Sequence, residues 1–113
     1  SLFSGKIHAL LCRTWKKRVK GRDYFDYIWF LSKNIPVNLY HLEQRLRQNH
    51  FLPDRGTFTK ETLMTLLNAK FAEVDFEQAK KDIKPFIPSD YDLSLWSSDF
   101  FSAITFDRLR VLE

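Results

Sequence analysis

The chain contains few residues that interrupt helices, and its apolar residues recur at helical spacing. Only three glycines and four prolines occur among 113 residues, and no alternation of apolar and polar residues lasts long enough to indicate a sheet. Apolar residues make up 44% of the chain, which is enough to form a core at this length without disulfides or metals. We therefore predict an all-α fold in which residues 1–113 form one compact domain, a bundle of about six helices.

Capping residues and prolines set the expected helix boundaries. Asn38, Thr59 and Asp75 each precede an apolar helical pattern, and their side chains can accept hydrogen bonds from free backbone N–H groups. Pro36 and Pro85 cannot continue a helix and mark two helix ends. The predicted helices cover 5–20 and 22–33, start at positions 38, 59 and 75, and finish with a helix over 96–112.

Positive charge is concentrated at the beginning of the chain. The first 22 residues carry seven Lys and Arg residues and no acid, whereas the rest carries 11 basic and 14 acidic residues. An anionic ligand is therefore expected to bind at this end of the chain.

Cys12 is the only cysteine, which excludes an internal disulfide and indicates a reducing, cytoplasmic location. No apolar run approaches the roughly 20 residues that span a bilayer, so no membrane partner is expected.

The predicted first helix is amphipathic. Five apolar residues gather on one side: Ile7, Leu10, Leu11, Trp15 and Val19. Five cations gather on the other side: Lys6, Arg13, Lys16, Lys17 and Lys20. The helix holds no acid that could pair with these cations. Two interpretations stay open, a solvated helix face or a basic patch, centred on Lys16, Lys17 and Lys20, that binds phosphates.

The predicted second helix is apolar nearly all round and is expected to lie in the core, yet it contains two carboxylates. Asp23 lies in the first turn, where the helix dipole stabilises a negative charge. Asp26 lies one turn further along the helix and needs a partner, because an unpaired buried charge is costly. A structural ion pair with a basic residue of the first helix and a catalytic or substrate-orienting role are both compatible with this position.

Other patterns that carry chemistry do not occur in the sequence. His8, His41 and His50 have no metal-ligand spacing with one another or with Cys12, so we predict no metal site. The chain has no Gly-rich phosphate loop and no Gly-x-Ser-x-Gly turn. We interpret Cys12 as a packing residue rather than a nucleophile, because its neighbours are apolar and basic.

Two linked motifs carry a family resemblance. Lys6-x-x-Ala9-x-x-x-Arg13, followed by Arg22-Asp23-x-x-Asp26, resembles the Lys-x-x-Ala-x-x-x-Arg and Arg-Asp-x-x-Asp motifs of AbiEii/AbiGii-type nucleotidyltransferase toxins. These are the toxins of bacterial abortive-infection toxin–antitoxin systems, which act in phage defence. The segments 42–46, 75–79 and 96–101 are similar to the C-terminal helical region of that family, so the resemblance covers essentially the whole chain.

The resemblance implies roles for these residues. Lys6 would contact the triphosphate of the incoming NTP, and Arg13 and Arg22 would help to bind the nucleotide. Asp26, with Asp23, would provide the acidic group of the active site. A positioned carboxylate can accept the proton of an acceptor, and fixed cations can stabilise phosphate charge. The implied partners are NTP, tRNA or another RNA acceptor, and a cognate antitoxin.

One element of such an enzyme does not occur in the sequence. Nucleotidyl transfer also needs a Gly-Ser or Gly-Gly strand-turn followed by an Asp-x-Asp pair that holds two Mg²⁺ ions. We therefore expect the chain to be the C-terminal part of a larger two-domain nucleotidyltransferase whose N-terminal metal-binding half is absent. We expect Mg²⁺ and NTP to serve only the full-length parent, and the isolated chain not to transfer nucleotides.

Two other functions fit the same residues. The chain could be a non-catalytic module that binds RNA or a protein through the basic face of the first helix. Alternatively, that face could dock on the expected N-terminal half. Binding that depends on Lys16 and Lys17 but not on Asp26 would indicate the module.

Overall fold

Helices form where the capping and apolar patterns predict them, and the computed structural model describes residues 2–13, 19–52 and 56–112. The six α-helices of these residues confirm the all-α prediction. They are α1 (Leu2–Cys12), α2 (Gly21–Ser32), α3 (Leu39–Gln48), α4 (Lys60–Glu73), α5 (Phe76–Ile83) and α6 (Ser98–Arg108). The described residues also form a short 3₁₀ helix, η1 (Lys84–Phe86), and two short strands, β1 (Val37–Asn38) and β2 (Val111–Leu112).

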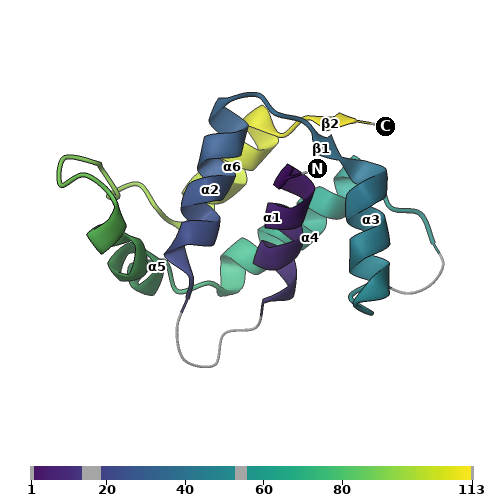
Figure 1. Cartoon of the computed structure of the whole chain (residues 1–113), viewed down its shortest axis with the longest axis horizontal. Coiled ribbons are helices and arrows are strands. Elements are labelled where there is room, and N and C mark those ends of the chain that lie inside the picture. The colour runs from purple at the N-terminus through teal and green to yellow at the C-terminus, as the bar shows by residue number, and fades with distance from the viewer. Residues whose placement is uncertain (1, 14–18, 53–55, 113) are drawn as a thin grey trace.

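The helices pack around α1 and α4. Figure 1 shows α1 between α2 and α3, with α4 behind it and α5 at the far end of the molecule. α1 packs against α2 and α3, α4 packs against α6, and α2 packs against α5. The two strands pair in parallel, with Val37 opposite Val111. The radius of gyration is 13.9 Å, close to the ~13 Å expected for a compact domain of about 100 residues.

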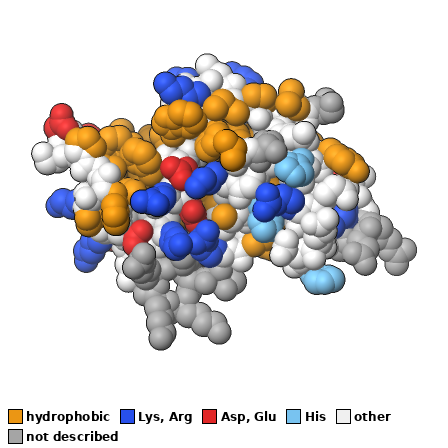
Figure 2. Space-filling model, viewed as in Figure 1, with side chains coloured by type: hydrophobic (Ala, Val, Ile, Leu, Met, Phe, Trp, Pro, Cys, Tyr) orange, Lys and Arg blue, Asp and Glu red, His pale blue; other side chains and the backbone are white. Residues whose placement is uncertain are grey.

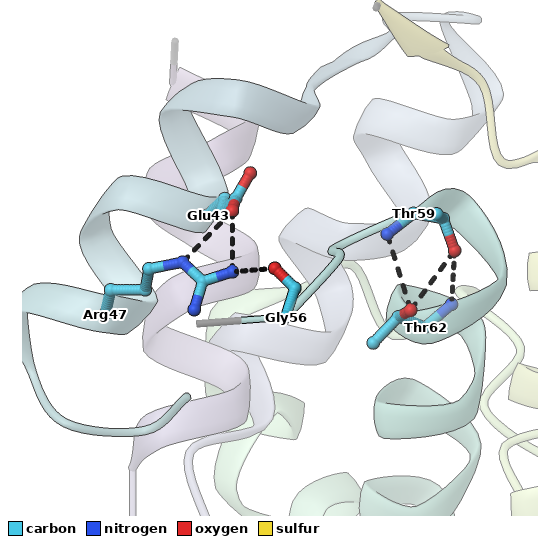
Figure 3. Close-up of polar contacts among 5 residues, drawn as sticks. All are labelled: Glu43, Arg47, Gly56, Thr59 and Thr62. Atoms are coloured by element: carbon cyan, nitrogen blue, oxygen red, sulfur yellow. Dashed lines mark hydrogen bonds and ion pairs between the residues drawn. The ribbon is translucent and has the colours of Figure 1, made fainter. Parts of the chain in front are cut away.

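The three predicted helix caps are confirmed. Asn38 accepts a hydrogen bond from the backbone N–H of His41, and Asp75 accepts from the first turn of α5. Thr59 caps α4 through a reciprocal pair of bonds with Thr62, which satisfies two backbone donors (Figure 3). These caps fix where three of the helices begin.

Arg47 of α3 binds the loop that connects α3 to α4. Its guanidinium binds Glu43 Oε2 at 3.0 and 2.7 Å and donates to the carbonyl oxygen of Gly56 at 3.0 Å (Figure 3). The described residues of the segment 51–57 contain no helix or strand.

The predicted boundaries of the first helix were wrong. α1 begins at Leu2 and ends at Cys12 rather than covering 5–20. The backbone N–H of Arg13 still donates to Ala9, but the Arg13 carbonyl oxygen accepts from the side chain of Lys70 at 2.9 Å. A tertiary contact thus satisfies a carbonyl group that a longer helix would have used.

The last helix is also shorter than the sequence predicted. It covers Ser98–Arg108 instead of 96–112, because Ser97 caps its start by accepting from the Phe100 N–H. After α6 the chain straightens, and the Arg110 carbonyl oxygen accepts from the Val37 N–H at 2.8 Å. Pairing with β1 therefore ends the helical region before Val111.

An aromatic core joins α2, α4 and α6. Tyr24, Tyr27, Phe71 and Phe101 are fully buried, and Tyr27 Oη lies 2.6 Å from Thr105 Oγ1. The prediction that α2 lies wholly in the core was wrong on one face, because Trp29 is 47% exposed. Among the described residues, the helices are too short and too polar to cross a membrane.

Candidate functional site

Lys6 and Asp26 meet between α1 and α2. Lys6 Nζ lies 2.7 Å from Asp26 Oδ2, and the two side chains are 38% and 25% exposed. Lys6 lies on the first half of α1 and Asp26 on the second turn of α2, so packing of these two helices brings the two motifs together. A phosphate or other anion from solvent can reach this partly exposed pair.

Arg13 and Asp23 form a second, deeper pair beside the first. Arg13 Nε lies 3.3 Å from Asp23 Oδ2, and the Asp23 side chain is only 6% exposed. Burial raises the pKa of Asp23, although the positive charges of Arg13 and Lys6 oppose that rise. We call Lys6, Arg13, Asp23 and Asp26 the α1–α2 charge cluster. Figure 2 shows basic and acidic side chains interleaved over α1 and α2 near the middle of this face.

Lys70 of α4 contacts the backbone of Arg13, a member of the cluster. Its side chain is 7% exposed, and its Nζ donates to the Arg13 carbonyl oxygen and lies 3.2 Å from Glu73 Oε1. The buried ammonium therefore fixes the backbone of Arg13, whose guanidinium faces Asp23. Lys70 was not predicted as a site residue, but its position seven residues after buried Leu63 places it on the apolar face of α4.

A close contact with α5 fixes the start of α2. A Cβ atom at Gly21 would lie 2.2 Å from the Ala79 carbonyl oxygen, so only glycine lets the two helices approach this closely. The Gly21 N–H donates to Asp82 Oδ2 at 2.9 Å, which caps α2 from a neighbouring helix. Gly21 lies between the predicted helices 5–20 and 22–33, but the contact with Asp82 was not predicted, because no local pattern reveals a cap that is 61 residues away.

Two further basic candidates line a cavity outside the cluster. Lys20 and Arg22 line a small cavity of ≈ 170 Å³ together with Asp82 and Phe86. Arg22 Cζ lies 5.4 Å from the centre of the exposed Phe86 ring, so its guanidinium is directed toward η1. Lys20 also acts on the cluster, since its charge opposes the rise that burial causes in the pKa of Asp23.

The structure thus brings Lys6, Arg13, Asp23 and Asp26 together. Arg22 lies near η1, and Lys16 and Lys17 lie outside the described residues. The ion pair between Asp26 and a basic residue of the first helix, one of the two interpretations left open for Asp26, is present as Lys6–Asp26. Arg13 likewise faces Asp23.

The donor set of the described residues does not form a metal site. No three His, Cys, Asp or Glu side chains of residues 2–13, 19–52 and 56–112 lie close enough to share a metal ion. Each acid of the charge cluster faces a Lys or Arg, which is the opposite of the arrangement that a divalent cation requires. Burial raises the pKa of the Cys12 thiol, which opposes thiolate formation.

Comparison with known proteins gives one family. The model of the family described as "Nucleotidyl transferase AbiEii toxin, Type IV TA system" matches residues 1–105. The match covers all six helices except the last residues of α6, and it includes the whole charge cluster. No curated protein and no solved structure matches the chain.

Proposed function

Because the chain belongs to the AbiEii nucleotidyl transferase toxin family of type IV toxin–antitoxin systems, we propose that its α1–α2 charge cluster forms part of a nucleotidyl-transfer site. The observation that carries this proposal is the Lys6–Asp26 pair, a cation and a carboxylate held 2.7 Å apart at an accessible position. The family implies an antitoxin as a partner. We also propose that the toxin acts in the cytoplasm, where NTP and RNA are present.

Lys6 releases Asp26 and binds the triphosphate of the incoming NTP instead. Partly exposed ion pairs contribute only about 0–1 kcal/mol, so a multiply charged phosphate can displace Asp26 from the ammonium group. The exchange leaves the Asp26 carboxylate free beside the bound nucleotide. Nucleotide binding therefore also prepares the acid for its role in the reaction.

Asp26 then accepts the proton of the acceptor hydroxyl. The hydroxyl oxygen, on tRNA or another RNA, forms a bond to the α-phosphorus of the NTP, and the bond from that phosphorus to the bridging oxygen breaks. Pyrophosphate leaves with the electrons of that bond, and the proton passes to Asp26. A carboxylate placed within hydrogen-bond reach contributes about 10²–10⁴-fold to such a step.

Arg13 and Asp23 keep this arrangement in place. The buried Asp23 carboxylate orients the Arg13 guanidinium toward the cluster, and Lys70 holds the Arg13 backbone. Arg13 stabilises phosphate charge next to Lys6. Arg22 and Lys20 line a separate cavity beside Asp82 and Phe86, where they contact nucleotide or acceptor phosphates outside the cluster.

The Mg²⁺ ions of the reaction do not fit this cluster, because its acids already face cations and the described residues hold no metal-ligand group. We propose that another part of the toxin supplies the metal ligands. Each function assigned here to Lys6, Asp26 and Arg13 depends only on charge and proton transfer at their own atoms.

Nucleotide-binding calorimetry on this chain tests the exchange of partners, because two substitutions predict opposite effects. Lys6→Ala should weaken ATP binding about tenfold, since it removes a charge-assisted contact. Asp26→Asn should tighten ATP binding severalfold, since it frees Lys6 from its internal partner. Lys33→Ala, an exposed lysine at the end of α2, is the control and should change the affinity by less than about twofold.

Transfer of labelled nucleotide to RNA, measured in a toxin that combines this domain with its metal-binding part, separates binding from chemistry. Asp26→Asn should lower the rate about 10²-fold or more while nucleotide still binds. Full activity of Asp26→Asn would contradict the proposal, and so would weaker ATP binding by that variant.

A further inference from the structure

A second cavity lies beside α5. It has a volume of ≈ 420 Å³ and is formed by α5 and by the segment 87–94 that folds back beside it. Its size lies within the range of about 300–1,000 Å³ typical of small-molecule pockets. None of the charge-cluster residues lines it. We call this cavity the α5 pocket; Figure 1 shows α5 at one end of the molecule.

One wall of the α5 pocket is basic. Glu77, Lys80 and Lys81 line it from one face of α5, and Lys84 lines it from the start of η1. Lys80 Nζ lies 2.8 Å from Glu77 Oε2. Within the part of the chain that the structure describes, Lys81 and Lys84 form no ion pair. Two ammonium groups are thus available to an anion.

The opposite wall is apolar. It is lined by Ile87, Pro88, Tyr91 and Leu93, and the Tyr91 ring packs against Phe25 of α2 with 5.3 Å between ring centres. Burial raises the pKa of Tyr91, so its hydroxyl stays neutral at physiological pH. The wall therefore offers a fixed aromatic ring and aliphatic surface. The hydroxyl groups of Ser89 and Ser94 also line the pocket.

We propose that the α5 pocket binds a nucleoside phosphate, with the base against the apolar wall and the phosphate between Lys81 and Lys84. A plain anion would leave the Tyr91 wall in contact with water, and an uncharged apolar ligand would leave both ammonium groups without a partner. A base with a phosphate matches both walls. A free mononucleotide and the terminal nucleotide of an RNA strand share this chemistry, and both are tested below. The inference does not depend on the proposed transfer site.

Calorimetric titrations of the chain test whether the ligand contacts both walls of the α5 pocket. Adenosine 5′-monophosphate (AMP) should bind at least tenfold more tightly than either adenosine or inorganic phosphate, because only AMP uses both walls. A three-nucleotide adenosine strand with a 5′-phosphate is titrated in parallel. Tighter binding of the strand than of AMP identifies an RNA end as the source, and equal or weaker binding identifies a free nucleotide.

Paired variants place the binding in the pocket. Lys81→Ala with Lys84→Ala should weaken AMP binding about tenfold or more, whereas Lys33→Ala with Lys60→Ala removes the same charge elsewhere and should change it less than twofold. The amide shifts that AMP causes over residues 77–94 should persist in Lys6→Ala, which separates this pocket from the transfer site. Backbone amide shifts over residues 77–94 report the location, and thermal unfolding verifies that each variant folds.

Four results would overturn the proposal. They are no AMP binding, adenosine or inorganic phosphate binding as tightly as AMP, equal affinity of the Lys81/Lys84 variant and its control, and amide shifts confined to α1 and the first half of α2. None of these results contradicts the transfer role of Lys6 and Asp26, which rests on different residues.

Discussion

The α1–α2 charge cluster and the α5 pocket hold their cations in different ways. In the cluster, Lys6 and Arg13 each face a carboxylate of α2 at 2.7 and 3.3 Å. In the pocket, Lys81 and Lys84 lie beside apolar surface and form no ion pair with other described residues. An anion entering the cluster must displace an acid, whereas an anion entering the pocket meets free ammonium groups. Local charge density therefore does not by itself locate an anion site, because internal partners decide which cations are available.

The largest effect is expected where the two regions meet, at Gly21. A Cβ atom there would clash with the Ala79 carbonyl oxygen at 2.2 Å and would lie 3.0 Å from Ile83 Cβ. Since backbone cannot move aside cheaply, Gly21→Ala should lower the free energy of unfolding by about 2–4 kcal/mol, measured by urea unfolding. It should also disturb the α5 pocket, because α5 must shift away from α2.

Gly5→Ala is the matched control for this change. A Cβ atom at Gly5 would meet only the far end of the Arg45 side chain, at 3.2 Å. That side chain can move, and alanine favours a helix by up to about 1 kcal/mol over glycine. Gly5→Ala should therefore be neutral or stabilising. Equal stability of the two variants would show that α2 and α5 are not held in close contact.

A comparison of two lysines sharpens the contrast between the regions. Lys70 beneath the cluster is 7% exposed and donates to the Arg13 carbonyl oxygen, whereas Lys81 at the pocket is exposed. Lys70→Met leaves that carbonyl group without its partner and should cost about 1–3 kcal/mol in urea unfolding. Lys81→Met should stay within about 0.5 kcal/mol of the wild type. A negligible cost for Lys70→Met would remove the support that we assign to it.

The sequence predicts features that depend on neighbouring residues well, and features that depend on residues far along the chain poorly. Caps at Asn38, Thr59 and Asp75 depend on neighbouring residues, and all three are confirmed. The end of α1 depends on Lys70, 57 residues away, and the end of α6 depends on pairing between β2 and β1. No helical pattern contains that information, so both ends were predicted too far along the chain.

The same distinction applies to the candidate site. The motif spacing identified Lys6, Arg13, Asp23 and Asp26, and the structure brings them together. Their catalytic and binding roles stay predictions. The motif also included Arg22, which faces Phe86 instead, because adjacent residues on a helix point about 100° apart. The α5 pocket was not predicted, since its two walls come from a helix and an irregular segment whose packing no periodicity describes.

The smallest expected effect is the pH dependence that Asp23 gives to stability. Burial raises the pKa of Asp23 above its ordinary value of 3.8 against the opposing charges of Arg13 and Lys6. A carboxyl group whose pKa is higher in the folded state stabilises the fold fully below pH 3.8, and this contribution is lost as the pH rises through the raised pKa. Asn cannot titrate, so Asp23→Asn lacks this loss.

Urea unfolding of the wild type and of Asp23→Asn, from about pH 3 to about pH 7, measures this contribution directly. The stability of the variant relative to the wild type should increase with pH across this range. The opposite trend would mean that the cations of the cluster outweigh burial and that Arg13 and Asp23 form a net stabilising pair. In that case the Arg13–Asp23 pair would stay intact when a phosphate binds, and exchange with a phosphate would be confined to the more exposed Lys6–Asp26 pair.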